Sequence, residues 1–101
     1  MIARVWRGAV RRKDADAYAE YMRGTGLREY QETPGNRGAF MLRREEGDLC
    51  EFVMLTFWDS LEAVKAFAGE DPDRAVFYPE DDRFLVQRDL KAQHFEVLEQ
   101  S

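Results

Sequence analysis

The stretch at residues 49–58, LCEFVMLTFW, constrains the fold more than any other, because it is apolar at both odd and even positions. It is rich in β-prone residues, so we predict a strand. Successive side chains of a strand point to opposite faces of its sheet. One face would carry Phe52, Met54, Thr56 and Trp58, and the other Val53, Leu55 and Phe57. Both faces of the sheet therefore need cover at this strand.

Three further segments are predicted as strands. Residues 37–45 come just before, and Glu46-Gly47-Asp48 between the two segments indicates a short hairpin connection. Residues 2–10 alternate well enough to form another strand. Residues 90–98 give the last one, with Phe95 and Val97 on one face and His94 and Glu96 on the other.

Helical spacing marks the segments between the strands. From Asp14, the positions of Tyr18, Tyr21, Met22 and Thr25 follow one helical face. Asp59 has the spacing of a cap for a second helix, whose buried stripe is Leu61, Val64, Phe67 and Ala68. Asp71-Pro72 predicts a shorter helix through Ala75 and Phe77. The run from Pro79 to Asp82 is expected to be a solvated turn.

The resulting order is β-α-β-β-α-β, in one domain of residues 1–101. This is the ferredoxin-like split arrangement, an α+β fold with both helices on one face of a four-stranded antiparallel sheet. The second face of that sheet stays apolar and uncovered. A two-fold partner stacking sheet on sheet would cover it, so we expect a homodimer. A monomer with an apolar ligand cleft is the competing explanation.

Charge and cysteine usage exclude several classes of function. A formal net charge of −5 argues against nucleic acid as a partner, because phosphate contacts need clustered Lys and Arg. One Cys and one His argue against a disulfide and a zinc site. We expect no metal and no cofactor, since Gly-rich phosphate loops are also missing. No signal peptide or long apolar segment is evident, so we expect a cytoplasmic protein without membrane contact.

Residues 57–67, FWDSLEAVKAF, together with Trp6 and residues 94–97, HFEV, resemble the antibiotic-biosynthesis-monooxygenase (ABM) domain. In that family the third strand ends in a Trp, followed by a Ser and a helix containing Glu-Ala. The resemblance implies a dimeric α/β barrel with a substrate pocket. It also implies oxidation of an electron-rich aromatic or polyketide-like compound by dioxygen, without metal or flavin. Trp58 matches the family position directly.

Heme-degrading relatives resemble the chain at Trp58 as well. They carry a histidine on the following helix as iron ligand and an asparagine on the first strand. Here residues 60–77 contain no His, and the first strand offers Arg4 and Trp6 in place of Asn. Heme degradation is therefore disfavoured.

His94 is the candidate general base, because it is the one side chain whose ordinary pKa lies near neutrality. A hydrogen-bonded structural role is its alternative. Trp58 and Tyr78 complete the predicted catalytic set, as an indole N–H donor with an aromatic wall and as a phenol. For both, simple packing is the alternative.

Five residues are predicted to bind substrate: Trp6, Arg4, Tyr21, Arg43 and Glu96. Trp6 and Tyr21 offer aromatic surface, and Glu96 should share the face of His94. Arg4 and Arg43 lie on apolar strands, where a guanidinium needs a carboxylate or a bound anion. Ion pairs with Glu51, Glu96 or Asp82 are the alternative for these arginines. The acidic residues between 70 and 82 lack the spacing of a calcium loop. We predict that they form a solvated surface.

Two functions remain open at this point. One is a cofactor-independent monooxygenase acting on a small aromatic molecule. The other is a non-catalytic, dimeric ligand-binding or stress-associated domain that uses the same pocket for recognition alone.

Overall fold

The computed structural model describes residues 1–101, and three long strands form the centre of its sheet. These strands are β1 (Ile2–Arg11), β2 (Asn36–Glu46) and β3 (Leu49–Trp58). Two short strands, β4 (Leu85–Arg88) and β5 (Gln93–Glu96), complete it. The helices are η1 (Arg12–Asp14), α1 (Ala15–Gly24), α2 (Gly26–Glu32), α3 (Leu61–Ala68) and α4 (Asp81–Phe84). The three long strands match the predicted segments closely.

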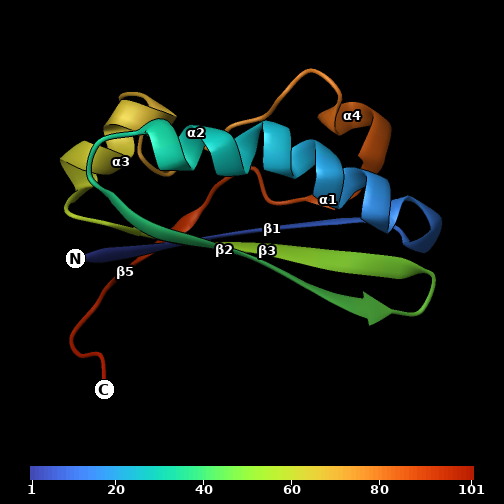
Figure 1. Ribbon diagram of the computed structural model, residues 1–101, viewed down its shortest axis with the longest axis horizontal. Coiled ribbons are helices and arrows are strands. Elements are labelled where there is room, and N and C mark those ends of the chain that lie inside the picture. The colour runs from blue at the N-terminus through green and yellow to red at the C-terminus, as the bar shows by residue number, and fades with distance from the viewer.

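The sheet is antiparallel with the order β2-β3-β1-β4, and β5 pairs with the same edge of β1 as β4. Figure 1 shows all helices above the sheet, whereas only the C-terminal tail extends below it. This is the predicted ferredoxin-like α+β arrangement. The sheet has five strands rather than the predicted four, because its last edge is divided. β4 pairs with β1 near Gly8 and Val10, whereas β5 pairs with it at Ile2–Val5.

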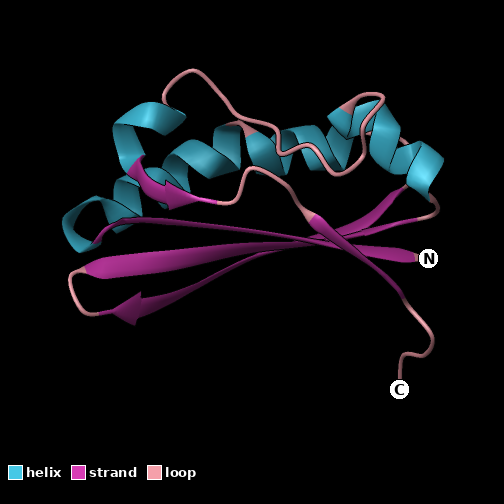
Figure 2. Cartoon of the chain, turned by 180° about the vertical axis from the view of Figure 1, so that it is seen from behind, coloured by secondary structure: helices cyan, strands magenta, loops and turns pink.

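The two faces of β3 differ sharply in burial, as the alternation of the strand requires. Every even position from Cys50 to Trp58 is buried beneath the helices, and every odd position is half-buried. Tyr18 of α1 packs edge-on against Phe52, with ring centroids 4.9 Å apart. The odd-numbered residues of β3 point away from the helices. In the reverse view of Figure 2, no helix lies on that side of the sheet, and only the C-terminal tail extends there. We call this side of the sheet the open face.

The segment from Gly69 to Glu80 is irregular, and the predicted helix through Ala75 and Phe77 is wrong. The carboxylate of Asp71 accepts the N–H of Asp73 at 3.0 Å, which forms a local turn. Beyond it, the N–H of Ala75 donates to the carbonyl of Leu90 at 3.1 Å, and the N–H of Ala92 donates to the carbonyl of Asp73 at 2.7 Å. Backbone pairing with residues 90–92 thus replaces the hydrogen bonds of a helix.

The expected solvated turn at Pro79 to Asp82 is also wrong in part. Asp81 begins the short helix α4 and is buried, with 3% of its surface exposed. Its Oδ2 accepts the backbone N–H of Tyr78 at 2.7 Å. An acidic side chain that binds backbone in this way is withdrawn from solvent, which sequence composition does not reveal.

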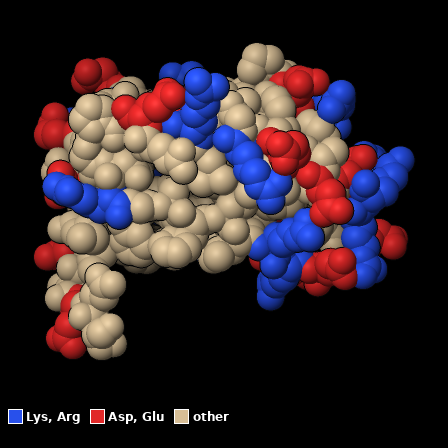
Figure 3. Space-filling model, in the orientation of Figure 1, with Lys and Arg blue, Asp and Glu red and all other residues tan.

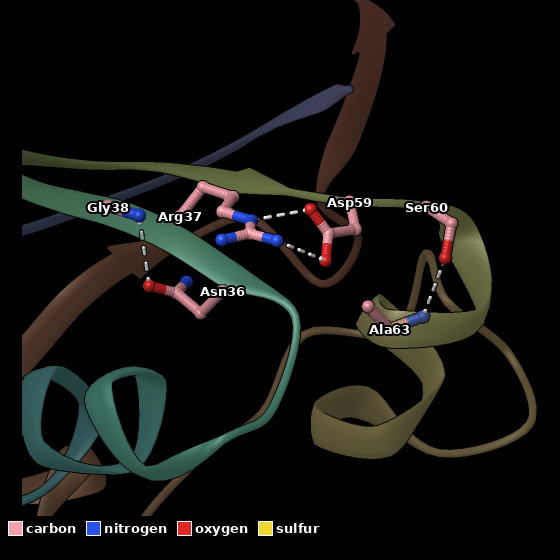
Figure 4. Close-up of polar contacts among 6 residues, drawn as sticks. All are labelled: Asn36, Arg37, Gly38, Asp59, Ser60 and Ala63. Carbon is pink, nitrogen blue, oxygen red and sulfur yellow. Dashed lines mark hydrogen bonds and ion pairs between the residues drawn. The ribbon is translucent and has the colours of Figure 1, made fainter.

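The N-cap of α3 lies one residue later than predicted. Ser60 is the N-cap, and its Oγ accepts the N–H of Ala63 at 3.2 Å (Figure 4). Asp59 instead receives two hydrogen bonds from Arg37, at 2.6 and 3.1 Å. Serine is a preferred N-cap residue, and here its hydroxyl caps the helix. The carboxylate of Asp59 is therefore not needed as a cap and pairs with Arg37 of β2.

Charged side chains gather at one end of the molecule in Figure 3, where the β2–β3 hairpin and η1 lie. Arg43 pairs there with Asp16, and Arg12 with Glu45. The middle of the same view is largely uncharged. None of the helices is both long enough and apolar enough to cross a membrane.

Candidate functional site

Arg4 is a buried cation without an ion-pair partner. It lies on the helix-facing side of β1 with 2% of its surface exposed. One guanidinium nitrogen donates to the backbone carbonyl of Arg74 at 2.9 Å, whereas Nε is buried without a partner. None of the ion pairs in the molecule includes Arg4. Burial lowers the pKa of this guanidinium, although arginine stays charged near neutral pH.

The imidazole of His94 shares the same face as Arg4. The two residues are directly opposite in the β1–β5 pairing, so their side chains lie on the same side of the sheet. Nδ1 of His94 is 2.9 Å from Oδ1 of Asp73. A carboxylate only accepts, so Nδ1 carries the proton and Nε2 has the lone pair in the neutral ring. Nε2 is buried and has no partner.

The protonation of His94 follows from these contacts. Burial is the largest influence and lowers the pKa of the imidazole, and the charge of Arg4 acts in the same direction. The hydrogen bond to Asp73 opposes both. The net effect is a pKa below the ordinary value, which keeps the ring neutral near pH 7 and able to accept a proton at Nε2.

An apolar cleft of about 440 Å³ lies next to this pair, between α3 and the irregular segment that follows it. We call it the α3 cleft. Its lining residues are Phe67, Ala68, Gly69, Arg74, Ala75, Val76, Phe77 and Leu90. Two of them contact Arg4. The guanidinium carbon of Arg4 is 5.3 Å from the ring centroid of Phe67, and Arg74 supplies the carbonyl that it binds. The cleft therefore adjoins the buried cation.

The two predicted tryptophans border this region from the core. Trp58 is fully buried at the end of β3, and its indole N–H donates to Oγ1 of Thr56 at 2.8 Å. Its ring packs against Phe67 with centroids 5.8 Å apart. Trp6 donates its N–H to the carbonyl of Asp89 at 2.8 Å and lies edge-on to Phe77, with centroids 6.3 Å apart. Both indoles thus support walls of the cleft and have their N–H groups occupied.

The predicted tyrosines hold the irregular segment against the helices. The hydroxyl of Tyr78 donates to the carboxylate of Glu29 on α2. Burial and this carboxylate raise the pKa of Tyr78, so its phenol stays protonated. The hydroxyl of Tyr21 accepts the backbone N–H of Glu80 at 3.0 Å. Both side chains fasten residues 78–80 to the helical layer.

Arg43 and Glu96 are not brought to the cluster. Arg43 pairs with Asp16 at 2.7 Å, in the charged end of the molecule. Glu96 is exposed beyond His94 and opposite Ile2. The ion pairs expected as alternatives for Arg4 and Arg43 are also wrong, because Glu51 pairs with Arg44 and Asp82 with Arg88.

Sequence reasoning missed three residues of this region. Asp73 contacts His94, the carbonyl of Arg74 accepts a hydrogen bond from Arg4, and the ring of Phe67 lies against both Arg4 and Trp58. Phe67 was predicted as core, and Asp73 as part of a solvated surface. No local sequence signal distinguishes Asp73 from its acidic neighbours, because its role depends on the pairing of residues 73 and 92.

A heme group does not fit the residues found here. Tyr30, Trp58 and Phe67 fill the space between α2, α3 and β3, with ring centroids 4.8 to 6.2 Å apart. The only imidazole, His94, holds Asp73 with one nitrogen and has the other enclosed by protein. No group of three or more His, Cys, Asp or Glu side chains is arranged to hold a metal ion.

Comparison with known proteins identifies the fold. No protein-family model matches the sequence. No curated protein matches it either. Solved structures do match over nearly the whole chain, and their descriptions name antibiotic biosynthesis monooxygenases. The chain is thus a ferredoxin-like α+β domain with the fold of the ABM-domain proteins, as the residue pattern predicts.

Three of these structures illustrate the structural similarity and the low sequence identity. A candidate monooxygenase from Nitrosomonas europaea has a TM-score of 0.71 at 14% identity, with 98% of this chain and 100% of that chain covered. Another from Bacillus cereus has a TM-score of 0.69 at 17% identity, covering 99% and 95%. A heme degrader from Mycobacterium tuberculosis, with two hemes in its active site, has a TM-score of 0.62 at 19% identity, covering 100% and 99%.

Proposed function

We propose that this protein binds a small aromatic molecule with a weakly acidic O–H or C–H group and transfers that proton to Nε2 of His94. The observation that carries the proposal is the pairing of two unpartnered buried nitrogens, Nε of Arg4 and Nε2 of His94, on opposed positions of β1 and β5. One is a cationic donor and the other a base. Together they match a group that loses a proton and becomes an anion.

The charges of the cluster support this chemistry. Deprotonation of a neutral substrate creates an anion and an imidazolium at once. The guanidinium of Arg4, which has no ion-pair partner, would stabilise the anion, because an opposite charge is strongly favoured where water is excluded. Asp73 already contacts Nδ1 and would stabilise the imidazolium while fixing the direction of Nε2. Trp6 and Trp58 back the apolar walls, and Tyr78 holds the segment that carries Asp73 in place.

Dioxygen is the co-reactant that we propose for the resulting anion, as in a cofactor-independent monooxygenase. A methylene group between aromatic rings becomes a carbonyl when it loses four electrons to one O₂. One oxygen atom forms the new carbonyl, and the other leaves as water with the two hydrogens removed. The fold relatives described as monooxygenases support this choice of reaction class.

Oxygen uptake with anthrone as the probe tests the proposal. We expect His94→Gln to lower the rate by about 10²- to 10⁴-fold, the usual contribution of a general base. Asp73→Asn should lower it less, because the base remains but its orientation is lost. Glu96→Gln is the matched control. It replaces an exposed carboxylate by an amide of the same size, two residues after His94 on β5. Equal rates for wild type and His94→Gln would contradict the proposal.

A binding domain without catalysis is the second candidate. It is favoured by the enclosure of both key nitrogens and by the bond from Arg4 to the carbonyl of Arg74, which must give way before a ligand reaches the cation. Saturable binding of anthrone without oxygen uptake at any pH between 6 and 9 would support this function over the first.

We also propose that a second copy of the chain covers the open face. Phe40, Leu42 and Phe95 project from that face, and each has about half of its surface exposed. Arg44 and Glu51 lie at one end of it and carry both signs of charge, so two copies related by a two-fold axis can place opposite charges together. We place this dimer in the cytoplasm, because Cys50 is buried without a disulfide partner.

A further inference from the structure

Arg74 is a second cation without an ion pair at the α3 cleft. It is exposed on the cleft wall, and none of the ion pairs includes it. The chain has an excess of acidic residues, and eight of its other arginines find a carboxylate. The adjacent Asp73 is occupied by His94 instead. The cleft thus has one unpaired guanidinium on its wall and another, that of Arg4, behind it.

The rest of the cleft is apolar and partly exposed. Phe77 and Leu90 have 37% and 71% of their surfaces exposed, although both line the cleft. Large apolar side chains left open around a concave surface are typical of ligand sites. A volume of about 440 Å³ is within the range for small-molecule pockets and accommodates a body of two or three fused rings.

We infer that the α3 cleft binds an aromatic carboxylate, with its rings against Phe77 and Leu90 and its carboxylate on the guanidinium of Arg74. The inference rests on the proposed function and names the substrate class of that same site. The inward end of such a molecule points toward Arg4, which leaves Arg4 and His94 to act on a phenol or methylene group at that end. Specificity for the carboxylate is then set at the rim, apart from the reacting atoms.

A singly charged anion suits this surface better than a phosphate. Glu70, Asp71 and Asp73 lie in the same segment as Arg74, and their negative charges repel a dianion more strongly than a carboxylate. The planar fork of a guanidinium also matches a carboxylate through two parallel hydrogen bonds. An apolar body removes water from around that contact, which strengthens it.

Calorimetric titration with three naphthalene probes tests the inference. The probes are 2-naphthoate, its methyl ester and 2-naphthol, which share a ring system and differ in charge and polar group. We expect Arg74→Gln to weaken 2-naphthoate binding about fivefold, as for a partly exposed ion pair. Binding of the ester and of 2-naphthol should be unchanged. Arg11→Gln is the matched control, because it removes an unpaired exposed arginine at the far end of β1 and should alter no affinity.

The outcomes separate this inference from the proposed function. Unchanged 2-naphthoate affinity in Arg74→Gln, or equal losses for all three probes, would overturn the inference even if anthrone oxidation depends on His94. An Arg74-dependent loss confined to 2-naphthoate would support it even if no oxygen is consumed, in which case the proposed reaction fails and the carboxylate site stands. Absence of any saturable 2-naphthoate binding to the wild type would also overturn it.

Discussion

Arg4 is poorly explained as a stabilising residue. A guanidinium costs free energy when it leaves water, and that cost is offset only when its donors are satisfied and its charge is paired. Arg4 has one hydrogen bond to a backbone carbonyl, an Nε without a partner, and no carboxylate at ion-pair distance. The presence of Arg4 in the core is better explained by a role in binding an anion.

Substitution Arg4→Met tests this view of the residue. Methionine has a similar length and no charge, so its burial avoids the desolvation cost, although it leaves the carbonyl of Arg74 without its partner. We expect the free energy of unfolding, measured in urea, to stay within about 1 kcal/mol of wild type or to rise. Oxygen uptake with anthrone should fall at the same time, because the anion formed from the substrate loses its stabilising cation. A large loss of stability would show that Arg4 is structural.

His94 gives the protein a defined dependence of stability on pH. Its folded-state pKa is lowered, chiefly by burial, so the unfolded chain binds the proton more readily. Neutral His94 contributes fully to the free energy of unfolding above its pKa in the unfolded chain, about 6.5. This contribution is lost as the pH falls from there through the lower pKa of the folded state. We expect the difference in unfolding free energy between wild type and His94→Gln to shrink across that window. A difference that grows on acidification would contradict the assignment.

At the scale of the elements, α3 depends on a cap that sequence spacing misplaced. Ser60→Ala removes the acceptor for the N–H of Ala63 and should cost about 1 kcal/mol of stability. Asp59→Ala removes only an exposed pair with Arg37 and should change stability little. Urea unfolding of both variants measures the contrast. If Asp59→Ala were the more damaging change, the cap assignment would be wrong.

The elements that sequence predicts well are those whose signals are local. β1, β2 and β3 follow from alternation and a short hairpin, and α1 and α3 from helical spacing. The chain after Gly69 is different, because its conformation depends on contacts with distant residues. Ala75 pairs with Leu90, and Asp89 donates its N–H to the carbonyl of Arg7 at 2.9 Å. Such contacts leave no periodic pattern in the sequence.

The candidate site was predictable only in part for the same reason. His94 and Arg4 are conspicuous by residue type, one as the sole histidine and the other as an arginine in an apolar strand. Their adjacency depends on the register of β1 with β5. The role of Asp73 depends on a turn, at a place where the Asp71-Pro72 pattern predicts a helix. Arg43, chosen by the same reasoning as Arg4, lies instead at the charged end of the molecule.

At the scale of the whole molecule, the candidate site and the proposed dimer interface lie on opposite faces of the sheet. The helix-facing side carries Arg4 and His94 with the α3 cleft beside them. Figure 1 shows the layer of helices on that side of the sheet. The open face carries apolar side chains from four strands and has no helix over it, and the C-terminal tail reaches only the part near Phe40 and Phe57. An apolar surface of this kind is unusual on a monomer. Homodimerisation would bury it without obstructing the α3 cleft, which lies on the other side.

Substitution Leu42→Glu tests that assembly. Leu42 lies on the open face opposite Val53, with 46% of its surface exposed, so a carboxylate is tolerated in a monomer but buried in a sheet-on-sheet dimer. We expect light scattering to give twice the chain mass for wild type and the single-chain mass for Leu42→Glu. Gln31→Glu on exposed α2 adds the same charge to the helical layer and should leave the dimer intact. A monomeric wild type at micromolar concentration would refute the proposed dimer and leave the α3 cleft unaffected.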